Sequence, residues 1–132
     1  MTYLYLTLSL FWFQPLPDPC GLTSVICPEE QPAYIQEYIR DEFNRAGLDG
    51  DLAVKIVELE SRFKADAIGT NRNGTKDFGY FQLNNYYWQD IIDDCFGKDN
   101  QLQCETAYAI KKVKSDKGFY AWTTLKLIYG NK

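Results

Sequence analysis

Residues Asp51 to Trp88 read DLAVKIVELESRFKADAIGTNRNGTKDFGYFQLNNYYW, and this stretch decides the fold of the chain. An apolar segment ends in Glu60-Ser61, a loop rich in Gly and Asn follows, and an aromatic segment begins at Asp77. The spacing of the apolar residues predicts a helix for the first part. Asn and Gly tolerate positive φ, so the loop is a turn, and the Phe- and Tyr-rich residues 77–84 predict a strand.

Glu60 is the candidate catalytic acid of this stretch. It shares one helix face with the apolar residues seven, four and three positions before it, which are Ala53, Ile56 and Val57. A carboxyl group on an inward, apolar face loses hydration, which raises its pKa and favours the neutral acid that can protonate a leaving group. Glu58 points elsewhere. The alternative is a solvated Glu at a helix end, paired with Arg62 or Lys64.

Asp77 supplies a second carboxyl group across the turn from Glu60. Glycosidases commonly place two carboxyl groups on either side of the bond they cleave. Polar and aromatic residues follow at once, and sugars offer both hydroxyl groups to hydrogen-bond and apolar ring faces to stack. The candidates for substrate contacts are Gln82, Asn84, Tyr87 and Trp88, although core packing is the alternative for about half of the aromatic residues in this region.

The same stretch resembles a known family. Glu60-Ser61, Ala67-Ile68-Gly69, Asn71, Asn73-Gly74-Thr75 and residues 77–84 (DFGYFQLN) are similar to the motifs of the lysozyme-like superfamily. The pattern looks most like the small lytic transglycosylases (SLT-type) of secretion and conjugation systems, and it is also similar to animal c-type lysozymes. The motif covers residues 53–88, and a weaker likeness continues to Trp122.

This resemblance implies an α+β, mostly helical fold with a small β-hairpin lobe beside the active-site cleft. It also implies cleavage of the β-1,4 bond between N-acetylmuramic acid and N-acetylglucosamine, with Glu60 as the acid, Asp77 as the charged stabiliser and Ser61 at the substrate site. In lysozymes an apolar pocket raises the pKa of the acid while a nearby Asp stays ionised. A lytic transglycosylase forms a 1,6-anhydro product, whereas a lysozyme uses water; we favour the transglycosylase.

The chain departs from the family pattern at its C-terminal end. Many lytic transglycosylases carry a Tyr-Asn-Ala-Gly segment, but this chain has Ala121-Trp122-Thr123-Thr124 in the corresponding region. The Tyr of that segment would hold the catalytic acid in place, so the presence of such a Tyr beside Glu60 is in doubt. Tyr120 and Tyr129 are the candidates to replace it. The formal net charge of −4 gives no long-range attraction to an anionic cell wall.

The 132 residues, 45% of them hydrophobic, fit one domain with one modest core. The absence of His excludes an imidazole base and a His-based metal site, and we expect no cofactor. Residues 1–19 form a separate segment, because Thr2–Phe13 has the length of the apolar core of a signal peptide and a Pro-rich stretch follows it. The alternative is an N-terminal strand or helix that stays packed on the catalytic domain, residues 20–132.

The chain has four cysteines, which fall into two close pairs, Cys20 with Cys27 and Cys95 with Cys104. An even count in a small exported domain suggests two disulfides, for which three connectivities are open, and we favour local pairing. Neither spacing is typical of a zinc site. The cysteines support export to the periplasm, the cell envelope or the extracellular space; the alternative is a cytosolic protein in which all four are free thiols.

The remaining elements are helical. We expect a helix over 29–47 with Pro32 in its first turn, and then a turn in which Asp49 or Asp51 caps the helix that carries Glu60. Three more helix faces are expected: one from Trp88, Ile91, Ile92 and Cys95, one from Ala107, Ile110 and Val113, and a last one from Phe119, Trp122, Leu125 and Tyr129. The basic run of Lys111, Lys112, Lys114 and Lys117 is read as a solvated face, with a role in gripping carboxylates of a wall polymer as the alternative.

Three functions stay open at this stage. The first is a peptidoglycan-cleaving enzyme, a monomer that binds glycan strands and no nucleic acid. The second is a non-catalytic glycan-binding relative, which needs neither Glu60 nor Asp77. The third is a component of a secretion or conjugation apparatus whose activity is incidental. The presence of both carboxyl groups favours the enzyme.

Overall fold

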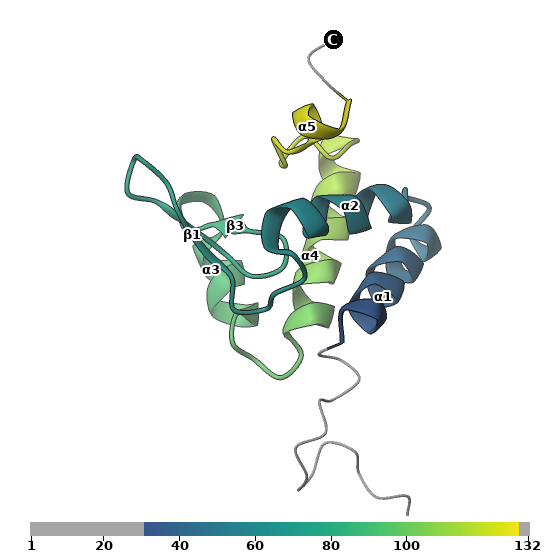
Figure 1. Cartoon of the computed structure of the whole chain (residues 1–132), viewed down its shortest axis with the longest axis horizontal. Coiled ribbons are helices and arrows are strands. Elements are labelled where there is room, and N and C mark those ends of the chain that lie inside the picture. Colours follow the sequence, from purple (N-terminus) through teal and green to yellow (C-terminus); the bar gives the residue numbers. More distant parts are fainter. Residues whose placement is uncertain (1–30, 130–132) are drawn as a thin grey trace, which may run out of the picture.

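The computed structural model describes residues 31–129 (Figure 1). The elements in chain order are α1 (Pro32–Arg45), α2 (Gly50–Ser61), β1 (Ile68–Thr70), β2 (Lys76–Phe78), β3 (Leu83–Asn84), α3 (Asn85–Cys95), α4 (Gln101–Asp116) and α5 (Leu125–Tyr129). The predicted α+β, mostly helical fold with a small β lobe is confirmed. The expectations for residues 1–19 and for Cys20 and Cys27 lie outside the described residues.

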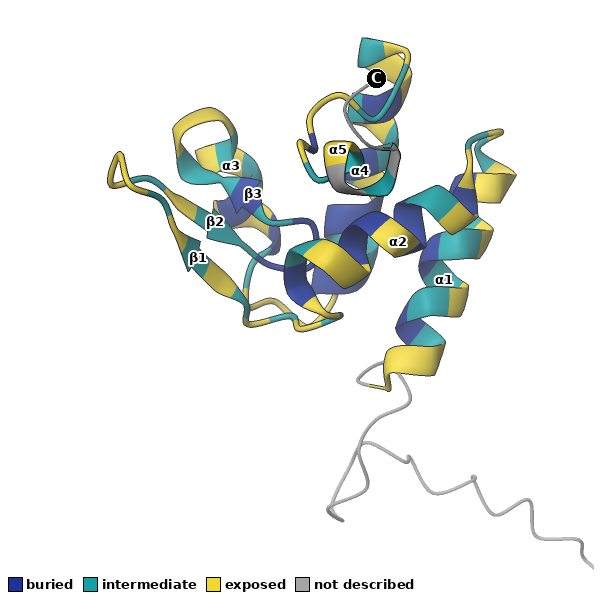
Figure 2. Cartoon of the chain, turned by 45° about the horizontal axis from the view of Figure 1, so that its top comes forward, coloured by how far each residue is buried: buried dark blue, intermediate teal, exposed yellow. Residues whose placement is uncertain are grey.

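Helix α1 and the β lobe, which consists of β1, β2 and β3, lie on opposite sides of α4 (Figure 1 and Figure 2). Figure 1 shows α1 on one side, the sheet and α3 on the other, and α2 crossing between them, and the turned view in Figure 2 shows the same order. Within residues 31–129, no helix is both long and apolar enough to cross a membrane. The apolar segment expected near the N-terminus is outside this range.

The first helix follows its sequence pattern closely. Pro32 is the first residue of α1, where its missing N–H costs no hydrogen bond. The helix therefore begins three residues later than the expected residue 29. Its apolar stripe turns inward, with Ile35, Ile39 and Phe43 buried. After α1 the chain reverses at Gly47, whose φ is +78°.

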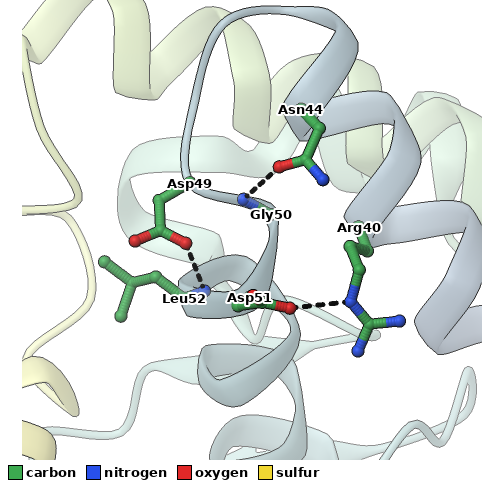
Figure 3. Close-up of polar contacts among 6 residues, drawn as sticks. All are labelled: Arg40, Asn44, Asp49, Gly50, Asp51 and Leu52. Carbon is green, nitrogen blue, oxygen red and sulfur yellow. Dashed lines mark hydrogen bonds and ion pairs between the residues drawn. The ribbon is translucent and has the colours of Figure 1, made fainter.

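Polar contacts fix the start of α2 against the end of α1 (Figure 3). The Asp49 side chain accepts a hydrogen bond from the backbone N–H of Leu52 at 3.0 Å, so Asp49 is the N-cap. The Asn44 Oδ1 atom accepts from the N–H of Gly50 at 3.0 Å. Asp51, the other candidate cap, instead forms an exposed ion pair with Arg40 at 2.7 Å. These contacts set the direction in which α2 carries Glu60 toward the β lobe.

The β lobe is a three-stranded antiparallel sheet in the order β1-β2-β3, rather than a hairpin. The predicted continuous strand over 77–84 is wrong, since β2 ends at Phe78 and β3 begins at Leu83. The chain turns between them because Gly79 has φ +79° and Gln82 has φ +51°, which no regular strand contains. The side chains of Tyr80 and Phe81 therefore enter the core together instead of alternating between two faces.

A disulfide ties α3 to α4. Cys95 and Cys104 are bonded, with an S–S distance of 2.06 Å, which confirms local pairing for this pair. Ile92 and Cys95 are buried on α3 as expected, whereas Trp88 interrupts the helix with φ −128°.

The buried face of α4 is rotated from the expected one. Ala107 is exposed and Ile110 only partly buried. The face that packs inward is made by Leu102, Glu105, Thr106, Ala109 and Val113. The expectation failed because two polar residues, Glu105 and Thr106, belong to this face, and an apolar pattern does not include them. α5 is also shorter than expected, since Phe119 and Trp122 precede its first residue, Leu125.

Aromatic rings join the lobes in one core, whose buried faces are dark in Figure 2. The Phe43 ring of α1 lies 6.2 Å from that of Phe81 and 5.7 Å from that of Phe119. The Phe81 ring lies 5.9 Å from Trp122, which is 5% exposed. The turn after β2 is thus anchored to the helical part by an aromatic cluster.

Candidate active site

Glu60 lies in the last turn of α2, at the edge of the core. The face that carries it is buried at Ala53, Ile56 and Val57, and Glu60 itself is half-buried. The helix ends one residue later, at Ser61, because Arg62 adopts a left-handed conformation with φ +53°. No ion pair within residues 31–129 includes Glu60, so the expected alternative of pairing with Arg62 or Lys64 is not observed.

The hydrogen-bond partner of Glu60 is Thr124. The Thr124 hydroxyl donates to the Glu60 Oε1 atom at 2.9 Å, from 64 residues further along the chain. Burial raises the pKa of the Glu60 carboxyl group, the Thr124 hydrogen bond opposes this effect, and the charge of Asp77 adds to it. The net effect raises the pKa, which favours the protonated acid.

Thr124 occupies the place for which two tyrosines were considered. Tyr120 is 75% exposed, and the Tyr129 side chain is outside what the structure describes. The comparison with the Tyr-Asn-Ala-Gly segment pointed to residues 121–124, but only tyrosines were considered as the partner of Glu60, so Thr124 was missed. Its contact with Glu60 exists only through the packing of the segment before α5 against the end of α2.

Asp77 is held on β2 by two side-chain amides. The Asn71 Nδ2 donates to Asp77 Oδ2 at 2.9 Å, and the Asn84 Nδ2 donates to Asp77 Oδ1 at 2.8 Å. Thr75 binds both asparagines, since its Oγ1 accepts from Asn71 at 3.1 Å and from Asn84 at 3.0 Å. The Asn/Gly loop therefore fixes the orientation of the Asp77 carboxyl group.

Glu60 and Asp77 line the same cavity, which has a volume of about 220 Å³. Its walls come from the end of α2, the sheet, the start of α3 and the segment before α5. The lining residues are Glu60, Asp77, Gln82, Leu83, Asn84, Tyr87, Trp88, Ala121, Trp122 and Thr123. The structure thus brings together six of the seven residues that the sequence indicated for catalysis and substrate binding.

Ser61, the seventh, lies elsewhere. It is 6% exposed, its hydroxyl donates to the Val57 carbonyl oxygen at 3.2 Å, and it does not line this cavity. That hydrogen bond is the common contact of a helical Ser with the preceding turn. The structure therefore does not place Ser61 with the six residues that line the cavity, and its hydroxyl binds the backbone at the end of α2.

The two amide residues of the cavity differ in what they can offer a ligand. Every polar atom of the Asn84 side chain is used, because its Oδ1 accepts from the Tyr86 N–H at 2.9 Å while its Nδ2 binds Asp77 and Thr75. Gln82 Nε2 donates to the carbonyl oxygens of Ala67 and Gly79, and no hydrogen bond within residues 31–129 involves its Oε1. Asn84 thus positions Asp77, while Gln82 keeps an acceptor for a ligand hydroxyl.

Two aromatic residues, Tyr87 and Trp88, border both this cavity and a second one beside it. Tyr87 is 79% exposed, and Tyr87, Trp88 and Ala121 also line a second cavity of about 580 Å³. The Trp88 ring is covered on one side by Lys112, whose Nζ lies 5.6 Å from the ring centroid and pairs with Asp116 at 3.0 Å. Of the basic run, Lys111, Lys114 and Lys117 are exposed, as expected for a solvated face.

Nothing in the described part of the chain groups three or more Cys, Asp or Glu residues as a metal site would require. A family model described as a lysozyme-like domain matches residues 42–124, more than half of the chain and all of the cavity described above. The chain belongs to the lysozyme-like domain family.

The chain is similar to several insect lysozymes. Lysozyme 1 of Musca domestica is 34% identical over 87 residues, which cover 58% of this chain and 62% of that protein. Lysozyme P of Drosophila melanogaster is 27% identical over 126 residues, covering 85% of this chain and 89% of that lysozyme. The lysozyme of Bombyx mori is 33% identical over 93 residues, covering 61% of this chain and 67% of that lysozyme.

Proposed function

We propose that this chain is a glycosidase that cleaves the peptidoglycan backbone at the β-1,4 bond between N-acetylmuramic acid and N-acetylglucosamine. The observation that carries the proposal is the pair of carboxyl groups in one cavity: a half-buried Glu60 with a raised pKa and an Asp77 fixed by two amides. Membership of the lysozyme-like domain family and similarity to proteins named lysozyme support it.

The chemistry follows from the different surroundings of the two carboxyl groups. Glu60 holds a proton and donates it to the glycosidic oxygen, while positive charge develops on the sugar ring. Asp77, which faces the same cavity, stabilises that charge electrostatically. Tyr87 and Trp88 offer ring faces on which neighbouring sugars stack, and Gln82 Oε1 accepts a hydrogen bond from a sugar hydroxyl group. A non-catalytic glycan binder would need neither carboxyl group.

For the second half of the reaction we propose transglycosylation. Glu60, deprotonated by the first step, takes the proton of the muramic acid 6-hydroxyl, and that oxygen closes a 1,6-anhydro ring. Proximity within one sugar supplies part of the rate. The segment from Ala67 to Asp77, which resembles small lytic transglycosylases, supports this choice, whereas the similarity to insect lysozymes supports hydrolysis, in which water attacks instead.

Digestion of purified peptidoglycan with the chain, followed by mass spectrometry of the soluble products, tests both levels of the proposal. We expect muropeptides lighter by one water than the hydrolysed forms. Reducing-end products alone would replace transglycosylation by hydrolysis, and intact glycan strands would contradict glycan cleavage. If the chain is a transglycosylase, the Asp77→Asn substitution should lower the cleavage rate less than the Glu60→Gln substitution does. Asp41→Asn, on the exposed face of α1, is the matched control.

We further propose that the protein works outside the cytoplasm, with residues 1–19 as an export segment. The disulfide between Cys95 and Cys104 supports this, because such bonds form in oxidising compartments. Intact-mass analysis of the protein from its native host should give a chain shortened near 17–19 with all cysteines oxidised. A full-length chain with free thiols would contradict it.

A further inference from the structure

Glu105 is a buried carboxyl group that does not line the cavity, and its position is the least expected feature of α4. It is 1% exposed, and no ion pair within residues 31–129 includes it. Burying an unpaired carboxyl group is costly unless hydrogen bonds compensate for the lost water. Such a residue needs a structural or functional reason, and its partners supply one.

All the hydrogen-bond partners of Glu105 are donors. Its Oε1 accepts from Gln101 Nε2 at 2.7 Å, and its Oε2 accepts from the Phe81 backbone N–H at 3.2 Å. The backbone of Tyr80 contributes a further hydrogen bond. Glu105 thus does for the turn 79–82 what a side-chain cap does for a helix, because it binds backbone groups of a turn that lies between two strands.

Gln101 extends this network to two more loops. Its Nε2 also donates to the Ala65 carbonyl oxygen at 2.8 Å, and its Oε1 accepts from the Gly97 N–H at 2.9 Å. The amide orientation of Gln101 is therefore fixed by partners on both sides. Gln101 and Glu105, one turn apart on α4, together bind the loop before β1, the turn after β2 and the loop after α3.

The turn that Glu105 holds is shaped to receive it. A Cβ atom at Gly79 would lie 1.9 Å from Glu105 Oε1, so only Gly allows this approach. On the other side of the turn, the Trp122 Nε1 donates to the Phe81 carbonyl oxygen at 2.9 Å. The same peptide segment is thus bound at its N–H by Glu105 and at its C=O by Trp122.

We propose that Glu105 is a positioning residue for the glycan-cleaving reaction: it holds the turn 79–82, and through that turn the Gln82 and Trp122 side chains that wall the Glu60 cavity. The proposal rests on the proposed function for its catalytic part. A misplacement of about 1 Å in a wall of an active site can lower the rate about 100-fold, even when the changed residue is remote.

Glu105→Gln is the test variant, since it keeps the size of the side chain but replaces one acceptor oxygen with a donor that faces other donors. We expect a loss of kcat/KM of tenfold or more on a soluble peptidoglycan oligosaccharide, measured at a temperature where circular dichroism shows a folded protein. Glu105→Asp keeps two acceptor oxygens and should recover part of the activity. Ile39→Val, a core change outside the network, is the control for mere destabilisation and should keep the wild-type rate.

A nuclear magnetic resonance spectrum of the indole N–H groups separates a positioning role from a purely structural one. The buried Trp122 N–H should shift and exchange faster with water in Glu105→Gln, while Ile39→Val leaves it unchanged. A folded Glu105→Gln protein with a wild-type rate and an unmoved Trp122 signal would overturn the proposal. If the wild-type chain does not cleave glycan, the proposed function fails, and the Trp122 signal alone decides whether Glu105 holds the cavity wall.

Discussion

Glu105→Gln should also change how the stability of the protein depends on pH. Burial raises the pKa of the Glu105 carboxyl group from 4.5 to about 7, against the hydrogen bonds from Gln101, Phe81 and Tyr80, which lower it. No Lys or Arg in the described part of the chain forms an ion pair with it, so burial is not offset by a partner charge.

The direction of the effect follows from where the proton is bound. Between pH 4.5 and about 7 the folded protein keeps a proton on Glu105 that the unfolded chain has lost. The stabilisation from this proton is therefore complete below pH 4.5 and disappears as the pH rises through about 7. Since one pKa unit corresponds to about 1.4 kcal/mol, the free energy of unfolding should fall by about 3 kcal/mol across this range.

Urea unfolding of the wild-type and Glu105→Gln proteins at pH values from 4 to 8 measures this contribution. The other carboxyl groups, Glu60 among them, are common to both proteins, so the difference between the two unfolding free energies isolates Glu105. We expect the wild-type advantage to be largest at pH 4 and to decline by about 3 kcal/mol by pH 8. A difference that stays constant over this range, or that grows with pH, would refute the reasoning.

Three further variants test separate contacts. Thr124→Val removes the hydroxyl that lowers the pKa of Glu60, so the alkaline limb of the pH–rate profile should move to higher pH, whereas Thr124→Ser should leave it in place. Replacing Cys95 and Cys104 by Ser opens a short loop, and chemical denaturation should show a loss of about 2–3 kcal/mol, with wild-type stability as the contrary result. Gly79→Ala should lower the melting temperature by several degrees, because its methyl group meets a buried carboxyl group, and an unchanged melting temperature would contradict the close approach.

The features that were predictable from the sequence depend on local patterns. The burial of α1 and α2 follows from their helical spacing, so the inward direction of Glu60 could be read from Ala53, Ile56 and Val57 alone. Residue type next to a turn narrowed the N-cap of α2 to Asp49 or Asp51, and the structure has Asp49. The disulfide between Cys95 and Cys104 matched the preference for local pairing.

The features that the sequence concealed depend on contacts between distant residues. The strand expected over 77–84 breaks at Gly79 because the turn is bound by Glu105, 24 residues beyond Phe81. Apolar periodicity placed the wrong face of α4 inward, since polar residues are buried there. Thr124 lies in the segment 121–124 that the family comparison indicated, but its hydrogen bond to Glu60, 64 residues away, depends on tertiary packing and could not be read from the sequence.

The role of Glu60 as the acid can be tested most directly with two neighbouring substitutions on α2. Glu60 lines the cavity, whereas Glu58 is exposed and pairs with Lys55 at 2.6 Å. Glu60→Gln should keep the fold and lower the rate of peptidoglycan cleavage at least 100-fold, because general acid catalysis supplies that much or more. Glu58→Gln should cleave at the wild-type rate. Full activity in the Glu60→Gln protein would show that Glu60 is not the acid.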